Sequence, residues 1–382
     1  MKVSVELLVI GAGPFGLAVA AQAGAQGVDY LVVGEPMGFW RSHMPERMLL
    51  RSGPDWHLDP LDEYTVERYL AERGQTAKEV EPLTREVYLD YVEWFQAGRN
   101  VQPEPVMVER LERDHGGGLV AFLTDGRTIA ALRVVLALGM GYFAHVPEDL
   151  AAMFPTGRGT HTCDAVDFAP LAWRRCLILG GRQSAFEWAA LIREAGAREV
   201  NVVHRHASPA FAEADWTWVN PLVDDMVGNP GWFRSLAVEE QQEVSRRLWA
   251  EGRLKVEPWL EWRIKCDGIT VWPDSTIVSC AELQTGNLAV TLDGGARLTV
   301  DDLIFATGYQ VDMERIPLLA HGDLLVELET RNGFPVLSER FESSVPGLFI
   351  TSMPAGQDFG PFFGFTVAAR TSAKIIGAAL AG

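Results

Sequence analysis

Three glycines near the start of the chain have the spacing of a phosphate-binding turn. Gly11, Gly13 and Gly16 follow an apolar run of the length of a buried strand. Small apolar residues at helical spacing come next, and then a second apolar run at residues 30–33. A tight strand-to-helix turn, the close approach of a pyrophosphate and close packing of helix on strand each exclude a Cβ atom. The stretch therefore predicts a strand–helix–strand unit that binds a dinucleotide at the start of its helix.

Residues beside this turn fit the same kind of site. Pro14 falls in the first turn of the expected helix, where the N–H group that proline lacks would have no partner. Glu35 follows the second strand, at about the twentieth residue of the unit, where such sites carry an acid for the ribose hydroxyls. A plain surface acid is the alternative. The first nucleotide is thus expected at Gly11, Gly13, Pro14, Phe15, Gly16 and Glu35.

The pattern returns near the middle of the chain. A short apolar run leads into Gly180 and Gly181, then into a helix and a closing strand at residues 200–203. Ala185 replaces the third glycine, which the fingerprint tolerates, but Arg182 replaces the second. The side chain of Arg182 either pushes the phosphates away or contacts them through its guanidinium group. A second nucleotide is expected at Gly180, Gly181, Arg182, Gln183 and Ser184.

Basic residues end this second unit where an NAD-selective site would carry an acid. His204, Arg205 and His206 follow the closing strand directly. Cations at this position suit the 2′-phosphate of NADPH, so we assign Arg205 and His206 to that phosphate. A solvent-exposed basic turn is the alternative.

Strand-like stretches follow each strand–helix–strand unit. Residues 106–111, 119–123 and 128–137 form one series, and residues 269–272, 277–283 and 288–292 form another. Turn residues separate the strands, so both series are predicted to be antiparallel meanders. The fold class expected is α/β, with two Rossmann-like dinucleotide-binding domains, for FAD and NADPH, that each carry a meander.

A tryptophan-rich stretch at about residues 211–262 differs from both units. Helix-forming segments such as residues 238–251 dominate it, and it predicts a helical insertion without a nucleotide role. The insertion could form a substrate lid or a homodimer surface, and both interpretations stay open.

Composition narrows the classes of partner. The 382 residues carry a net charge of −18, which argues against nucleic acid and an anionic membrane as main partners. No window approaches the roughly twenty apolar residues of a membrane span. The four cysteines lack metal-like or C-x-x-C spacing, so we expect no metal site and reduced thiols in a cytoplasmic protein.

These motifs together resemble the two-dinucleotide-binding-domain flavoproteins, in particular NADPH-dependent flavoprotein monooxygenases of the flavin-containing and N-hydroxylating kinds. The first fingerprint looks like their FAD site and the second like their NADPH site. Residues 305–309, Phe-Ala-Thr-Gly-Tyr, resemble a segment shared by the N-hydroxylating members, although Glu314 stands where these carry His or Pro. Phe154, Gly157 and His161 resemble the F-x-G-x-x-x-H motif, with Phe154 one residue early and Ala165 in place of Trp or Pro.

The resemblance implies further site residues. The aromatic and sulfur-rich run at residues 39–50 is similar to a flavin-side loop, with core packing as the alternative. Residues 356–364 offer backbone N–H groups before a closing helix. With residues 305–309, these segments add Trp40, Arg41, Met48, Thr307, Gly308, Asp358 and Phe359 to the FAD site. His161 is the candidate catalytic residue at the junction of the domains.

By the same resemblance, FAD binds a discontinuous domain of residues 1–153 and 300–382, and NADPH binds residues 154–299. The implied function is an FAD-containing, NADPH- and O₂-dependent monooxygenase that oxygenates an N, S or C atom of a small-molecule substrate through a flavin (hydro)peroxide. The alternative is an NADPH-dependent reductase that passes electrons to a quinone or a protein acceptor. A third hypothesis, motivated by Arg182, is a non-catalytic nucleotide-sensing or scaffold protein.

Overall fold

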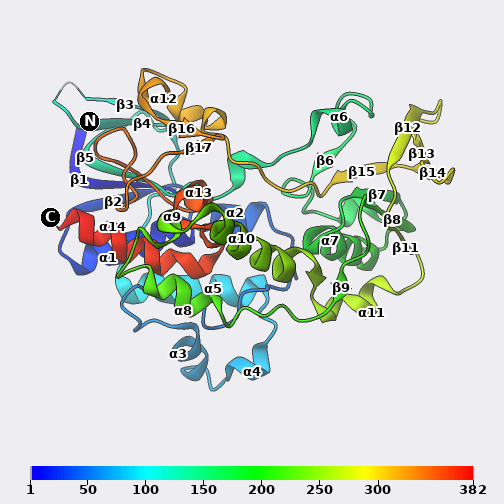
Figure 1. The fold of residues 1–382 in the computed structure, drawn as a ribbon, viewed down its shortest axis with the longest axis horizontal. Helices are drawn as coiled ribbons and strands as arrows, with labels where there is room; N and C mark the ends of the chain where they lie inside the picture. The colour runs from blue at the N-terminus through cyan, green and yellow to red at the C-terminus, as the bar shows by residue number, and fades with distance from the viewer. Residues whose placement is uncertain (1, 115, 382) are drawn as a thin grey trace.

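The computed structural model describes residues 2–114 and 116–381. Two units, each built on a parallel sheet with helices against it, lie side by side in Figure 1. The first unit contains both chain termini. This is the α/β architecture with two dinucleotide-binding folds that the sequence predicts.

The sheet of the first unit has the strand order β2-β1-β5-β4-β3, with β18 beside β5. Strand β1 (Lys2–Ile10) runs parallel to both β2 (Tyr30–Val33) and β5 (Thr128–Leu136), so their carboxyl ends meet at one edge. The predicted meander is confirmed, because β4 (Leu119–Leu123) pairs antiparallel with β3 (Val108–Arg113) and with β5. β18 (Leu348–Ile350) adds a parallel strand from the far end of the sequence. Helices α1 (Pro14–Ala25) and α14 (Ala369–Leu380) pack together, and their buried faces belong to the main core.

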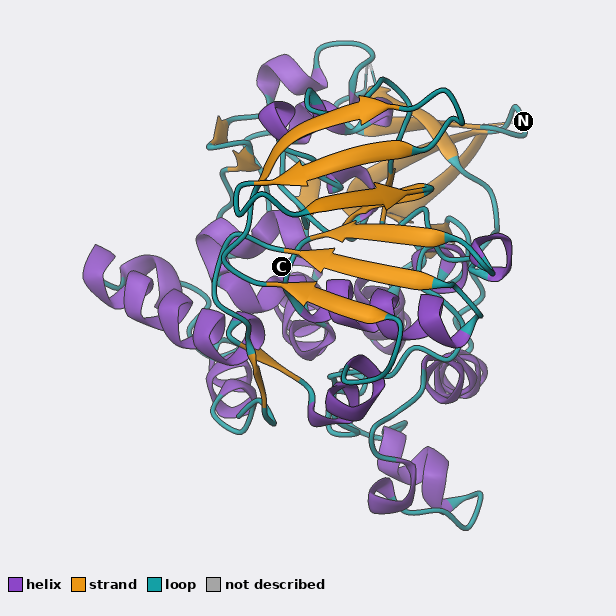
Figure 2. Cartoon of the chain, turned by 90° about the vertical axis from the view of Figure 1, so that its right-hand side faces the viewer, coloured by secondary structure: helices purple, strands orange, loops and turns teal. Residues whose placement is uncertain are grey.

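The second unit has a parallel sheet of order β11-β8-β7-β15-β6. Its members are β6 (Thr160–His161), β7 (Arg175–Leu179), β8 (Glu199–Val203), β11 (Ile269–Trp272) and β15 (Asp302–Phe305), and α7 (Gln183–Glu194) links β7 to β8. Strands of this unit face the viewer in Figure 2, with helices behind them.

Two predictions about this unit are wrong in detail. Residues 269–272 do not start an antiparallel meander, because β11 extends the parallel sheet beside β8. The meander consists of β12 (Ile277–Glu282), β13 (Leu288–Leu292) and β14 (Arg297–Val300). The chain also leaves this unit after residue 305 rather than at residue 300, since β15 pairs with β7. A short strand of mostly apolar residues fits either sheet equally well, so the local sequence does not distinguish them.

The helical insertion packs on both units. It comprises α8 (Val219–Asp225), α9 (Trp232–Ser235), α10 (Val238–Arg253) and α11 (Glu261–Ile264), with short strands β9 (Ala210–Phe211) and β10 (Lys255–Val256). Val219, Val223 and Leu248 belong to the core of the first unit, whereas Ile264 belongs to that of the second. The insertion was predicted as part of the NADPH-binding domain, but it bridges the two units (Figure 1).

The remaining elements are short, apart from α5, and lie mostly in the first unit. They are α2 (Gly38–Ser42), α3 (Val66–Ala71), α4 (Ala77–Val80), α5 (Arg85–Arg99), α6 (Glu148–Ala151), α12 (Leu324–Glu327), α13 (Gly356–Phe359), β16 (Thr330–Arg331) and β17 (Phe334–Pro335). Among the described residues, none of the helices combines the length and the apolar character needed to cross a bilayer.

Candidate functional site

A pocket of about 470 Å³ opens at the carboxyl edge of the first sheet. The turn between β1 and α1 forms one wall, and the ends of β2 and β5 form the next. Helix α2 and the segment before α14 close the other sides. Six of the predicted FAD residues line it: Gly11, Gly13, Pro14, Phe15, Glu35 and Trp40.

Gly13 and Gly16 have different structural roles in this turn. A Cβ atom on Gly16 would lie 1.8 Å from the carbonyl oxygen of Gly11, so Gly16 serves the packing of α1 on the strand. A Cβ atom on Gly13 would meet nothing within 4 Å, because Gly13 faces the open pocket. This cradle at the N-terminus of a 12-residue helix fits the pyrophosphate of a dinucleotide.

The other predicted FAD residues do not line the pocket. Arg41 turns away to pair with Glu93 at 2.7 Å, and Met48 packs against the core of the second unit. Asp358 is buried, accepts the N–H of Leu337 at 2.8 Å and pairs with Arg331.

The last three lie in the core or at the junction of the units. Phe359 is fully buried and stacks on Phe341 with ring centroids 3.7 Å apart. Thr307 donates to the carbonyl of His145, and the N–H of His145 donates to the carbonyl of Gly308 at 2.9 Å. Thr307 and Gly308 therefore tie the two connecting segments together.

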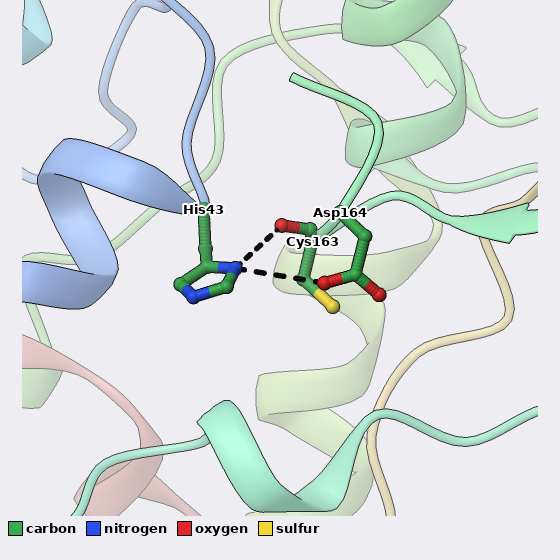
Figure 3. A group of neighbouring side chains, drawn as sticks. All are labelled: His43, Cys163 and Asp164. Atoms are coloured by element: carbon green, nitrogen blue, oxygen red, sulfur yellow. Dashed lines mark hydrogen bonds and ion pairs between the residues drawn. The ribbon is translucent and has the colours of Figure 1, made fainter. Parts of the chain in front are cut away.

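Sequence reasoning missed part of the lining. Residues 137–142 follow β5, and their position beside the fingerprint follows from the parallel pairing of β5 with β1, which no local motif reveals. His43 also lines the pocket. Figure 3 shows its imidazole turned toward the Cys163–Asp164 segment of the second unit. The only sequence signal for His43 was its place in the aromatic run.

The second fingerprint forms the turn between β7 and α7. Gly180 has φ of +144°, and a Cβ atom there would lie 2.3 Å from the carbonyl oxygen of Ala306. A Cβ atom on Gly181 would lie 2.4 Å from the ring of His204. Gln183 and Ser184 begin the helix, whose first N–H groups have no intrahelical acceptor. Despite its altered sequence, this turn therefore presents free backbone N–H groups at the start of α7.

The guanidinium group of Arg182 leaves this turn and contacts α10. Its Nη1 donates to the carbonyl oxygen of Arg253 at 2.6 Å, and the group lies 4.6 Å from the centroid of Trp249. Its backbone is extended, with φ of −118°, so the position does not require glycine. In this structure Arg182 holds the insertion against the second unit.

The basic residues after β8 divide into one buried and two accessible side chains. His204 is buried, and its Nδ1 lies 2.8 Å from the carbonyl oxygen of His206. Arg205 is exposed and His206 is half-buried, so both remain candidates for a 2′-phosphate contact.

The loop at residues 43–51 joins the two units. Arg47 approaches Glu194 at 3.5 Å, and Arg51 pairs with Glu257 at 2.7 Å. Buried Glu187 faces this loop, and burial raises its pKa, while the pairing with Arg263 at 3.0 Å opposes the rise. The loop predicted beside the flavin therefore also anchors the second unit.

His161 lies at the junction of the units, as predicted, but both ring nitrogens have protein partners. Nε2 lies 3.0 Å from the carbonyl oxygen of Gly308, and Nδ1 lies 3.1 Å from the sulfur of Cys163. Burial lowers the pKa of His161 and raises that of the Cys163 thiol to about 12. These contacts describe a neutral linking residue, and a catalytic role stays a prediction.

Comparisons with known proteins agree with this geometry. The sequence profile of the pyridine nucleotide-disulphide oxidoreductase family matches residues 8–246, more than half of the chain. L-lysine N6-monooxygenase of Escherichia coli is 25% identical over 370 residues, which cover 88% of this chain and 84% of that protein. Ferredoxin–NADP reductase of Saccharopolyspora erythraea is 31% identical over 210 residues, 53% of this chain and 54% of that protein.

The match to the FAD-dependent urate hydroxylase of Xanthomonas campestris is shorter, at 30% identity over 34% of this chain and 28% of that protein. This chain thus spans about half, or less, of the length of several curated relatives that it matches.

Solved structures share the fold over the full length. The ornithine hydroxylase of Pseudomonas aeruginosa superposes with a TM-score of 0.78 at 17% identity, covering 99% of both chains. The ornithine N-hydroxylase of Kutzneria sp. 744 superposes with a TM-score of 0.79 at 15% identity and the same coverage. The chain belongs to the pyridine nucleotide-disulphide oxidoreductase family, a family of FAD- and NAD(P)H-dependent oxidoreductases.

Proposed function

We propose that this protein is an NADPH-dependent flavoprotein monooxygenase that inserts one oxygen atom of O₂ into a nucleophilic atom of a small organic substrate. The observation that carries the proposal is the share of this chain that each relative covers. The lysine monooxygenase aligns over 88% of this chain, whereas the ferredoxin–NADP reductases align over about half of it.

FAD bound in the pocket would accept a hydride from NADPH and activate O₂. The protein's own residues bind and orient the reactants. The turn around Gly13 holds the pyrophosphate of FAD, and the carboxylate of Glu35 accepts hydrogen bonds from the ribose hydroxyl groups. The turn from Gly180 to the start of α7 holds the pyrophosphate of NADPH, and Arg205 supplies the charge for its 2′-phosphate.

A reductase is the second candidate, favoured by the repeated matches to ferredoxin–NADP reductases. Such an enzyme would pass electrons to a quinone or a protein acceptor without inserting oxygen. A disulfide substrate is less well supported, because the sequence has no C-x-x-C pair and the four cysteines are free thiols.

The deciding experiment measures the fate of O₂ in the purified, FAD-loaded protein. With NADPH and a panel of amines, sulfides and ketones, a monooxygenase transfers one ¹⁸O atom from ¹⁸O₂ to product and oxidises one NADPH for each product formed. Consumption of NADPH with ferredoxin or quinone reduction, and without labelled product for any compound, would favour the reductase. FAD binding without any bleaching of the flavin by NADPH would support the nucleotide-sensing hypothesis.

A further inference from the structure

His43 is fixed at the boundary between the pocket and the second unit. Its ring lines the pocket and stacks on Phe39, with centroids 5.4 Å apart. Its Nδ1 lies 2.8 Å from the carbonyl oxygen of Cys163 and 3.7 Å from Oδ1 of Asp164 (Figure 3). Two units of the fold therefore determine the orientation of one imidazole in the pocket.

The partner of Nδ1 decides which nitrogen carries the hydrogen. A backbone carbonyl oxygen only accepts hydrogen bonds, so Nδ1 of His43 must donate. In the neutral ring this leaves the lone pair on Nε2. Within residues 2–114 and 116–381, no side chain or backbone group hydrogen-bonds to that Nε2, and the side chain is 43% exposed. The free nitrogen can take up a proton and release it to a ligand of the pocket.

Asp164 is the charged neighbour of this ring. Its carboxylate stabilises an imidazolium at His43 more than a neutral imidazole, although its 59% exposure keeps the effect modest. Glu35 lines the same pocket, and two further titratable groups near the ring are uncharged. Burial keeps the thiol of Cys163 and the phenol of Tyr309 protonated, and Arg85 donates to the carbonyl of Met44 at 2.5 Å.

We propose that His43 is the proton carrier of the flavin pocket, and that Asp164 of the second unit is its positioning residue. The inference rests on the proposed binding of FAD in this pocket. Oxygenation converts substrate, O₂, NADPH and one proton into oxygenated substrate, NADP⁺ and water, and reduction of a quinone also takes up one proton per NADPH. In either reaction Nε2 of His43 takes that proton from solvent, delivers it into the pocket and returns to the neutral form.

A metal site is the competing hypothesis for the same side chains. An imidazole nitrogen, a thiol and a carboxylate of His43, Cys163 and Asp164 lie within 4.8 Å of one another. A metal would need the lone pair of Nδ1, which the hydrogen bond to the carbonyl excludes, and a thiolate at Cys163. These two requirements argue against a metal site. Metal binding is the outcome that would replace the proposal.

The first test reads the protonation of His43 directly. Histidine-selective ¹⁵N NMR on the FAD-loaded protein, with the His43 signals assigned from His43→Gln, should show a neutral Nδ1–H tautomer with a free lone pair on Nε2. An Nε2–H tautomer would overturn the proposal. His43 signals that change with EDTA and return with Zn²⁺ would assign the cluster to a metal instead.

The second test separates the carrier from its positioning residue. Asp164→Asn should move the pH profile of turnover toward lower pH, because it removes the carboxylate that lies 3.7 Å from Nδ1 of His43. Glu46→Gln is the control, since it removes one negative charge from an exposed residue of the same loop. It should leave the pH profile unchanged.

His43→Gln should bind FAD normally and lower turnover roughly 100-fold. Turnover at the wild-type rate with any acceptor would overturn the role. Failure of ¹⁸O incorporation alone would reject the monooxygenase but not the proton carrier, because quinone reduction and the tautomer seen by NMR still report on His43.

Discussion

Arg182 and Arg51 hold the same end of helix α10 from opposite units. Arg182, in the second fingerprint, donates to the carbonyl oxygen of Arg253 at 2.6 Å, and Arg51, in the first unit, donates to that of Gly252 at 2.8 Å. Both cations lie near the C-terminal carbonyls of a 16-residue helix, where positive charge is favourable. The arginine that replaces a glycine of the fingerprint thus fastens the C-terminal end of α10 to the turn between β7 and α7.

Replacing Arg182 with glycine should loosen α10 without unfolding the second unit. A hydrogen bond from a charged donor at this exposed position contributes about 1 kcal/mol, so amide exchange at the C-terminal turn of α10 should accelerate about fivefold. Hydrogen–deuterium exchange of the protein without NADPH measures this. Arg205→Ala, which removes an exposed arginine, is the matched control and should leave the exchange unchanged. Unchanged protection in Arg182→Gly would show that α10 does not depend on this contact.

Gly13 and Gly16 should respond differently to the same substitution, because only Gly13 faces the pocket. Gly13→Ala should leave the stability of the FAD-free protein within about 0.5 kcal/mol and weaken FAD binding at least about tenfold, since the added methyl group displaces the pyrophosphate. Gly16→Ala should destabilise the fold by about 1–3 kcal/mol or more through overlap with the Gly11 carbonyl. Urea unfolding and FAD titration separate the two effects. Full FAD affinity in Gly13→Ala would remove this turn from the FAD site.

Local patterns in the sequence predicted the parts of the fold whose chemistry is local. Gly180, with φ of +144°, and Gly16, with no room for a Cβ atom, leave a signature because no other residue fits. The two strand–helix–strand units, the first meander and the helical insertion followed from such signals. Glu35 and Trp40 also lie at the pocket, as their positions predicted.

The rest depended on contacts between distant segments. Met48 and Trp40 belong to one aromatic run, but Met48 packs on the second core while Trp40 lines the pocket. Phe359 follows a glycine-rich turn signal, yet stacking on Phe341 places it in the core. The role of His43 depends on a carbonyl more than one hundred residues away, at Cys163. Spacing along the chain carries no record of such pairs.

Arg205 should determine the preference for NADPH over NADH. It is exposed directly after β8, where the 2′-phosphate is expected, and one exposed charge-assisted contact is worth about 1 kcal/mol or slightly more. Arg205→Ala should therefore raise KM for NADPH about five- to tenfold and leave KM for NADH unchanged. Arg198→Ala, which removes an exposed arginine at the other end of β8, should change neither. Equal rises for both nucleotides would exclude a phosphate contact.

Buried His57 should make stability fall in mild acid. Its Nε2 accepts a hydrogen bond from Arg370 at 2.7 Å, and burial, with the nearby Arg370 charge, lowers its pKa to about 4. An unfolded histidine binds a proton below about pH 6.5. The free energy of unfolding is therefore unaffected by the protonation of His57 above pH 6.5 and falls as the pH is lowered toward 4. Between pH 7 and pH 5, this single group should lower the free energy of unfolding by about 2 kcal/mol.

His57→Gln isolates this contribution from all other acid-sensitive groups. The glutamine amide oxygen can replace Nε2 as the acceptor for Arg370 but does not titrate, so the variant should lose about 2 kcal/mol less than the wild type between pH 7 and pH 5. Urea unfolding at both pH values gives the two differences. His321→Gln, which removes an exposed histidine, should follow the wild type. Parallel pH dependence in wild type and His57→Gln would mean that His57 is charged in the folded protein, and its contact with Arg370 would then have to break.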